Sequence, residues 1–333
     1  MPPIRPRRTP SGNWFPRSPD VLERLGGAKY NNGLPGSDNP FFSVHATEGL
    51  LRLMSDERSA VVAMLCRSSD RTGAGARGAA ELAPLIARRL GCSARLVGSV
   101  AEGRTSGFAE DLRDSHGCLL EAGGQIADAL ATGRAPVLLA GDCSIALATL
   151  PALAGAWPHA RVLWLDAHGD FNTPDTTPSG FLGGMALSGA CGQWATGFAG
   201  AIAPERVVLA GVRDLDERER DLLERSSVTV VGASLETLVY VQNALDRAPV
   251  YVHLDLDVLD PTSFPALFPA AGGLEPDKLY DLLEAVAGEC ELVGLEVTAF
   301  EAPEDPLERA AAASTALGAI EPLLAALIER DDL

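Results

Sequence analysis

The stretch RVLWLDAHGD (residues 161–170) joins a short apolar run directly to a group of charged side chains. Two other stretches have the same form, APVLLAGDCS (135–144) and PVYVHLDLDVLDP (249–261). Short apolar runs that alternate with longer amphipathic stretches are typical of parallel βαβ units, whose strands are buried on both faces. We therefore predict an α/β fold with a doubly wound, mainly parallel sheet between two layers of helices.

The alternation continues from residue 59 to the end of the chain, so we predict one domain over 59–333. Residues 1–58 differ, being rich in Pro, Gly and Asn, and we predict a separate N-terminal arm there. The arm either packs loosely on the domain or covers an active site or a neighbouring subunit, and both interpretations stay open. Strands are expected at 60–65, 136–140, 161–165, 206–210, 228–231, 249–254 and 292–297. Helices are expected at 78–90, 115–131, 217–225, 235–244, 276–286 and 306–330.

Composition narrows the class of partner. The 333 residues include 27 Lys and Arg and 45 Asp and Glu, so the net charge is −18. A surface this acidic repels phosphate backbones and anionic lipid headgroups, which argues against nucleic acid and membrane partners. A metal ion that needs carboxylate ligands, or a cationic small molecule, fits better.

The six cysteines lack CxxC spacing, and a chain of this length does not need a disulfide framework. We therefore expect a reducing, cytoplasmic environment. The basic start of the chain is not followed by the apolar core of a signal peptide, and we find no run of about 18 apolar residues. We expect neither export nor a membrane span.

Residues of the types that bind metal ions occur directly after several of the expected strands. Ligands of open parallel sheets bind beyond the carboxyl ends of the strands, so these positions are the first candidates for a site. Alternate residues of an extended segment point to the same side, which would bring Asp166, His168 and Asp170 together, and likewise Asp255 and Asp257. So many carboxylates repel one another unless cations neutralise them. An oxygen-rich site with one imidazole suits Mn²⁺, and we expect two ions.

Cys143 follows the strand expected at 136–140 and has three possible roles. These roles are a catalytic nucleophile, a metal ligand and a buried structural thiol. Neighbouring carboxylates would raise the pKa of the thiol, which disfavours an unassisted nucleophile, whereas a metal ion would remove the proton. We favour the ligand role.

AGDCS (140–144), DAHGD (166–170) and HLDLDVLDP (253–261) resemble the motifs of the ureohydrolase (arginase/agmatinase) superfamily, and the resemblance runs from about residue 60 to the end. It implies an arginase-like, three-layer αβα fold, two Mn²⁺ ions, hydrolysis of a guanidino group to an amine and urea, and a homo-oligomer of three or six chains. It also implies the ligands of each ion. The first ion would take Cys143, Asp166, Asp170 and Asp255, and the second would take Asp166, His168, Asp255 and Asp257. Asp170 would also accept the proton of the attacking hydroxide.

Four positions depart from the family motifs. Cys143 stands in place of a histidine ligand, and in the loop SGFLGGM (179–185) Phe181 replaces a substrate-contacting Asn and Gly183 a proton-shuttling His. The family's guanidinium-binding Glu falls at Ala299. Glu301, two residues further and on the same side of an extended chain, is our candidate for that role.

Four other positions match substrate contacts of the family. Asn172 and Ser179 match residues that hold an amino acid's carboxylate, and Asp216 and Glu219 match residues near its amino group. Each also has an ordinary structural interpretation, because Asn172-Thr-Pro is a turn signal and Asp216 and Glu219 suit the start of a helix.

Within the family the matching text, including DFNTPDTT and LSGACG, is most similar to the branch that hydrolyses Nω-hydroxy-L-arginine in D-cycloserine biosynthesis. A hydroxylated guanidine is less basic and needs less help from a proton shuttle, which suits Gly183. We predict a metal-dependent amidinohydrolase that releases urea or hydroxyurea from a modified arginine in natural-product biosynthesis. Alternatives are a large guanidino substrate, such as a guanidino polyketide or a peptidyl arginine, a non-catalytic metal-binding homologue, and a hydrolase with Cys143 as nucleophile.

Overall fold

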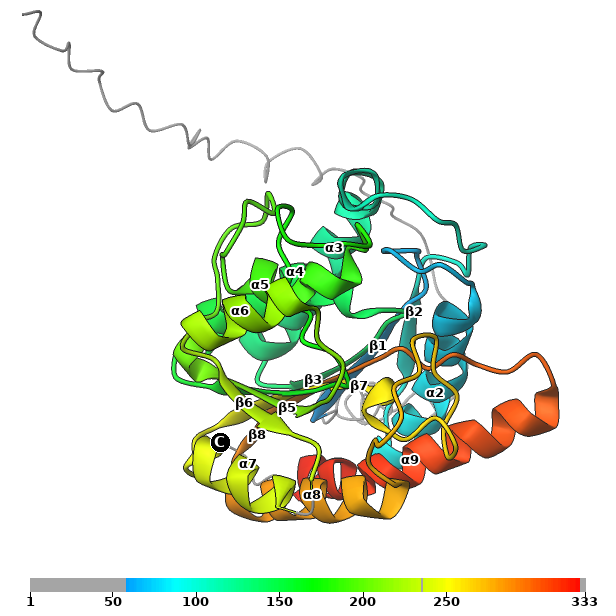
Figure 1. Cartoon of the computed structure of the whole chain (residues 1–333). Helices are drawn as coiled ribbons and strands as arrows, with labels where there is room; N and C mark the ends of the chain where they lie inside the picture. Colours follow the sequence, from blue (N-terminus) through cyan, green and yellow to red (C-terminus); the bar gives the residue numbers. More distant parts are fainter. Residues whose placement is uncertain (1–57, 235, 330–333) are drawn as a thin grey trace, which may run out of the picture. The chain divides into compact units, whose positions relative to one another are not determined.

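The computed structural model describes residues 58–234 and 236–329, so the predicted arm at 1–58 lies outside the described residues apart from Arg58. The described part contains an eight-stranded sheet in which every pair of neighbouring strands is parallel. The strand order across the sheet is β2-β1-β3-β8-β7-β4-β5-β6 (Figure 1). The strands are β1 (Ser59–Met64), β2 (Ala94–Val97), β3 (Ala135–Leu139), β4 (Arg161–Leu165), β5 (Val207–Val212), β6 (Thr229–Gly232), β7 (Val250–Asp255) and β8 (Leu292–Thr298).

Helices cover both faces of the sheet and complete three layers (Figure 1). One face carries α3 (Phe108–Ala131), α4 (Ala146–Ala156), α5 (Ala186–Ala190) and α6 (Glu217–Arg225). The other face carries α2 (Ala74–Leu90), α7 (Thr237–Leu245), α8 (Pro276–Glu289) and α9 (Pro306–Glu329). The predicted three-layer αβα class is therefore confirmed.

The central strands are buried on both faces, which explains why their sequences are continuous apolar runs. Every residue of β3, β5, β7 and β8 is buried. The seven predicted strands all form, with ends shifted by up to two residues. The sequence analysis missed β2, because this edge strand is partly exposed and its residues, ARLV, form no apolar run.

The order of the strands in the sheet determines where the site lies. The chain leaves β3 and enters the sheet again at β4, with a gap of two strands between them that β7 and β8 later fill. Ligands of doubly wound sheets bind at such a switch, beyond the carboxyl ends of the strands. The carboxyl ends of β1, β3, β8, β7, β4 and β5 adjoin one another there, so loops far apart in the sequence meet.

One expectation about the chain needs correction. Cys66, directly after β1, forms a disulfide with Cys118 on α3, whereas we expected reduced thiols. Spacing could not reveal this pair, because 52 residues separate the two cysteines in sequence while the fold brings their Cα atoms to 6.3 Å.

One helix, α9, is long and apolar enough on average for a membrane span, with 24 residues and a mean hydropathy of 1.7 over an 18-residue window, although it contains no unbroken run of 18 apolar residues. Alanines and leucines dispersed among a few polar residues produce this average. Leu323, Leu324 and Leu327 lie in the hydrophobic core beneath the sheet, so α9 packs as a core helix.

Candidate metal centre and substrate pocket

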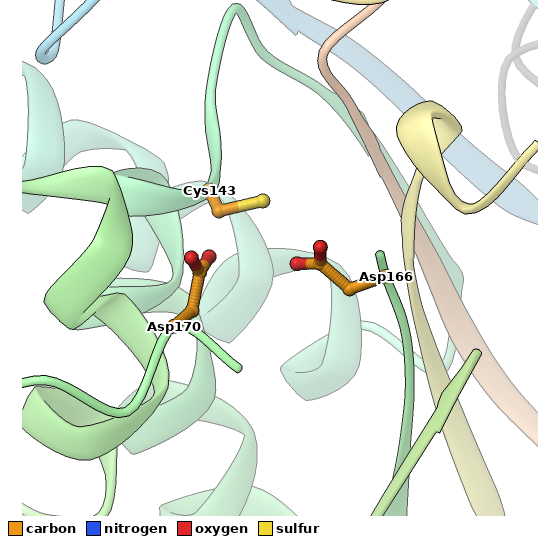
Figure 2. A group of neighbouring side chains, drawn as sticks. All are labelled: Cys143, Asp166 and Asp170. Atoms are coloured by element: carbon orange, nitrogen blue, oxygen red, sulfur yellow. The ribbon is translucent and has the colours of Figure 1, made fainter. Parts of the chain in front are cut away.

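The six predicted ligands come together at the carboxyl edge of the sheet. Cys143 begins a 3₁₀ turn after β3, the DAHGD residues follow β4, and Asp255 and Asp257 lie at the end of β7. Ligand atoms of Cys143, Asp166 and Asp170 lie within 4.8 Å of one another, and so do those of Asp166, His168 and Asp257. Figure 2 shows the thiol of Cys143 and the carboxylates of Asp166 and Asp170 pointing toward one another. Asp166 belongs to both groups.

The backbone that brings these side chains together is not extended, as the sequence analysis assumed. The Asp166 carboxylate accepts the His168 backbone N–H at 2.7 Å, and the Asp255 carboxylate accepts that of Asp257 at 2.7 Å. These side-chain-to-backbone bonds two residues apart form turns directly after the strands. Asp170 then lies in the left-handed region, with φ 47°. The side chains of the predicted ligands are brought together by these two turns and by the left-handed backbone of Asp170. The surrounding structure must stabilise that conformation.

Burial and mutual repulsion set the pKa values of the carboxylates. Burial, followed by the charge of a neighbouring carboxylate, raises the pKa of Asp166, Asp170 and Asp255. At His168 burial acts against the charged ring, but hydrogen bonds with Asp166 and Asp257 outweigh it and raise the pKa to about 12. The site therefore attracts positive charge strongly.

This donor set fits two divalent cations. Four buried carboxylates repel one another in a medium of low dielectric constant, and cations remove that repulsion. Carboxylate oxygens with one imidazole suit Mn²⁺ and similar ions, whereas the thiolate of Cys143 adds a softer donor. Asp166 belongs to both groups, so it would be a shared ligand if two ions were bound.

Cys143 lies against a buried pair that the sequence analysis did not identify. Its Sγ is 3.2 Å from Nε2 of His253, whose Nδ1 is 2.7 Å from Oε1 of Glu296. The ring of Trp164 stacks on that of His253 with 3.6 Å between centroids. His253 and Glu296 are fully buried on neighbouring strands β7 and β8. A carboxylate and an imidazole inside buried strands were the available sequence signal, because charged groups are rarely fully buried unless paired.

Burial, together with the charges of Asp255, Asp170 and Asp166, raises the pKa of the Cys143 thiol well above its usual value. The thiol also lies 3.0 Å from a carboxylate oxygen of Asp255. A bound cation would favour the thiolate at this position, whereas the protein alone favours the protonated thiol. The electrostatics agree with a ligand role for Cys143.

A cavity of about 500 Å³ opens onto the cluster. The predicted substrate-binding residues Asn172, Ser179, Phe181, Gly183, Asp216 and Glu219 all line it, together with Glu301 and Ala299. The sequence analysis missed Arg71 and Phe268 on its wall. Neither position belongs to a motif, and only the fold brings the loops that carry them to the site.

Glu301 reaches the pocket by a different path from the one expected. Ala299 has φ 58° and the Glu301 backbone N–H bonds to the Ala299 carbonyl oxygen at 3.0 Å, so the chain turns after β8 instead of continuing extended. Thr72 donates a hydrogen bond of 2.8 Å to the Glu301 carboxylate. This contact orients a carboxylate whose pKa burial raises.

Phe181 and Gly183, two of the departures from the family motifs, depend on each other. A Cβ atom on Gly183 would lie 2.5 Å from a ring carbon of Phe181. The ring is confined, because it packs against Phe268 at 5.2 Å between centroids and the Arg71 guanidinium lies 5.0 Å above it. A histidine at position 183 is therefore incompatible with this phenylalanine.

We expect Gly183→Ala to lower the free energy of unfolding by about 1–3 kcal/mol, since the new methyl group overpacks against the ring. Gly184→Ala is the matched control, because a Cβ there meets nothing within 4 Å. In a Phe181→Ala background the cost of Gly183→Ala should vanish. Urea unfolding measures all of these variants, and equal stability of Gly183→Ala and the wild type would contradict the coupling.

The four remaining positions line the pocket, and most of them also make ordinary structural contacts. Asn172 is buried, donates to the Asp216 carboxylate at 3.1 Å and accepts from Thr176 at 2.9 Å, as a turn residue does. Asp216 directly precedes α6. The Glu219 carboxylate accepts the Phe171 backbone N–H at 2.8 Å. These contacts order the pocket wall, whereas Ser179 is exposed at its rim.

Glu219 gives the metal-free protein a pH dependence. Burial raises its pKa from 4.5 to about 7. Between these values the folded state binds the proton more tightly than the unfolded state, so stability falls as pH rises through this window, by roughly 1–3 kcal/mol. We expect Glu219→Gln to flatten the dependence of the urea midpoint on pH between 5 and 8 in chelator. Glu224→Gln, at an exposed position of α6, should keep the wild-type slope.

The loop after β1 supports the cluster from behind. Asp142, next to Cys143, accepts hydrogen bonds from Ser68 Oγ at 2.8 Å and from the Ser69 backbone N–H at 2.8 Å. It also accepts the Ser144 backbone N–H at 2.8 Å. A Cβ on Gly141 would lie 1.8 Å from a carboxylate oxygen of Asp70, so only glycine fits there. Asp142 therefore positions Cys143 and is not available as a ligand.

The fold and the site define an α/β protein with a carboxylate-rich cluster at the carboxyl edge of a parallel sheet. The sequence model of the arginase family matches residues 102–321. Nω-hydroxy-L-arginine amidinohydrolase of Streptomyces lavendulae is 36% identical over 264 residues, which cover 79% of this chain and 96% of that protein. The chain therefore belongs to the arginase family.

Arginase of Bacillus caldovelox is 36% identical over 173 residues, which cover 46% of this chain and 57% of that enzyme. Its crystal structure matches with a TM-score of 0.67 and 26% identity, covering 83% of this chain and 99% of that one. The arginase-like fold is thereby confirmed over most of the described residues.

Proposed function

We propose that this protein is a metal-dependent amidinohydrolase that hydrolyses the guanidino group of a modified arginine, with Nω-hydroxy-L-arginine as the leading candidate. The observation that carries the proposal is the cluster of six ligand-type side chains, five of them buried, at the floor of a pocket. The similarity to the S. lavendulae amidinohydrolase supports the choice of substrate. A role in natural-product biosynthesis is part of this proposal.

The residues of the site have separate roles in the proposed hydrolysis. Two Mn²⁺ ions held by Cys143, Asp166, His168, Asp170, Asp255 and Asp257 would supply an activated water for attack on the guanidine carbon and would stabilise the charge that develops there. Asp170, whose carboxylate lies beside that of Asp166 and the thiol of Cys143, would accept a proton from the attacking water and return one to the departing amine. Glu301, oriented by Thr72, holds the guanidinium, and Glu219 and Asp216 face the amino end.

The size of the cavity bears on the alternative of a large substrate. A volume of about 500 Å³ is typical of sites that enclose a small metabolite. A guanidino polyketide or a peptidyl arginine would have to leave most of its length outside such a pocket. The cavity therefore favours an amino-acid-sized substrate.

A second candidate function gains support from one observation. Cys143, His253 and Glu296 are joined by contacts of 3.2 and 2.7 Å, the order of groups found in cysteine hydrolases. Against this candidate, Cys143 is only 3% exposed and its thiol pKa is raised. A nucleophilic cysteine would give chelator-resistant activity that alkylation abolishes, whereas a ligand cysteine gives activity that chelation abolishes.

The test is mass spectrometry of reactions with Mn²⁺-loaded protein. The substrates are Nω-hydroxy-L-arginine, L-arginine, agmatine and a long-chain guanidine, each with and without chelator. We expect ornithine and hydroxyurea from the first, and none with chelator. Turnover of the long-chain guanidine alone would favour a large substrate. No turnover of any of the four by metal-loaded protein would favour a non-catalytic homologue.

We further propose that the protein acts in the cytoplasm, as its cysteine spacing suggests, and that it forms a homo-oligomer of three or six chains, as the family resemblance suggests. The Cys66–Cys118 disulfide is more typical of an oxidising compartment, so fractionation of the producing cells is the appropriate test. Light scattering of the purified protein tests the oligomer.

A further inference from the structure

Arg71 is an unpaired cation on the wall of the pocket. Among the described residues that line this cavity, it is the one lysine or arginine. Its Nε atom is buried without a hydrogen-bond partner, and no ion pair of its guanidinium is found in the described part of the chain. Because this side chain lines the cavity and its charge has no ion-pair partner among the described residues, the guanidinium is available to an anionic group of the substrate.

The position of Arg71 is fixed by its neighbours. Arg67 Nε donates to the Asp70 carbonyl oxygen at 2.9 Å and Arg67 also pairs with Asp111 at 2.7 Å, which holds the loop. The guanidinium carbon of Arg71 lies 5.0 Å from the ring centroid of Phe181, within the range of a cation–π contact. The loop and the ring together present the guanidinium to the cavity with little freedom left to lose on binding.

The pocket carries several anionic groups, among them Asp216 and Glu219 at the start of α6, whereas Arg71 in the loop after β1 is its one Lys or Arg among the described residues. An arginine presents a planar fork of donors that matches the two oxygens of a carboxylate. A zwitterionic amino acid meets both kinds of group, but a decarboxylated or esterified guanidine does not.

We propose that Arg71 binds the carboxylate of the substrate and thereby selects guanidino compounds that carry a negative charge at the end remote from the guanidine. The inference rests on the proposed amidinohydrolase function and adds a specificity-determining residue to it. Phe181 supports this residue by stacking under it, which gives a role to the side chain that replaces the family's Asn.

The experiment compares Arg71→Met, which keeps the length and removes the charge, with Arg71→Lys and the wild type. Nω-hydroxy-L-arginine and its methyl ester serve as substrates, and calorimetry with Mn²⁺-loaded protein measures the binding of L-ornithine and putrescine. Arg95→Met is the control, since Arg95 is exposed on β2 and pairs with Glu121. Circular dichroism melting confirms that each variant is folded.

For Arg71→Met we expect KM for the free acid and Kd for ornithine to rise about 10- to 100-fold. The ester and putrescine should change less than about two-fold, because they lack the charge that Arg71 binds. Arg71→Lys should fall between, since it keeps the charge and loses the fork.

Equal changes for the free acid and the ester, or no change for either, would overturn the role of Arg71 while leaving the proposed function intact. Absence of turnover and of ornithine binding in the metal-loaded wild type would overturn the proposed function, and the inference with it. The two failures are thus distinguishable.

Discussion

Asp170→Asn should lower kcat by about 10²- to 10⁴-fold, the range expected for loss of a general base. The amide cannot accept the proton, and it is a weaker ligand than the carboxylate. The backbone should tolerate the change, because Asn also adopts the left-handed conformation that Asp170 has at φ 47°. Steady-state kinetics and metal analysis of the purified variant measure the loss.

The same change should stabilise the metal-free protein. Burial and the charge of Asp166 raise the pKa of Asp170, so its ionisation opposes folding, and this cost appears as pH rises above the ordinary pKa of an aspartate. At pH 8 the neutral amide removes that cost. Asp175→Asn, at an exposed position of the same loop, is the control and should alter neither activity nor stability. If Asp170→Asn kept full activity, its assignment as base would be wrong.

The second large effect concerns the pair behind Cys143. We expect His253→Leu to lower the free energy of unfolding by about 3–5 kcal/mol, because it leaves the Glu296 carboxylate buried without its imidazole partner. The double variant His253→Leu/Glu296→Leu should be more stable than the single one, since no buried charge remains. His159→Leu is the control at an exposed histidine. Urea unfolding provides these values.

The pair should also affect the ligand that it contacts. In Co²⁺-substituted protein, a Cys143 thiolate gives a sulfur-to-metal charge-transfer absorption. We expect this band to shift and weaken in the double variant, which lacks the 3.2 Å contact between His253 and Cys143 but keeps the fold. An unchanged band would mean that His253 and Glu296 serve packing alone.

The sequence predicted the layers, the central strands and the six ligand-type residues, because each depends on local pattern. Apolar runs reveal strands buried on both faces, and DAHGD and LDLD follow two of them directly. The edge strand β2 was not predicted, because it is partly exposed and its sequence contains no apolar run. The convergence of Asp166 and Asp170 was predicted correctly from an incorrect backbone, because spacing does not distinguish an extended segment from a turn.

The rest of the site depends on contacts between distant segments. Arg71 reaches Phe181 only because the loop after β1 and the loop before α5 meet at the same edge. His253 and Glu296 pair because β7 and β8 are neighbours, an arrangement that sequence order alone does not reveal. The exclusion of a side chain at Gly183 by Phe181 is likewise a property of packing, although both departures were visible in the sequence.

A titration of metal-free protein with Mn²⁺, following the release of ornithine from Nω-hydroxy-L-arginine, tests the metal dependence of the reaction most directly. We expect no activity before metal is added, a rise that saturates near two ions per chain, and complete loss on chelation. Full activity in excess chelator, abolished by alkylation of Cys143, would contradict this expectation and assign the reaction to the cysteine.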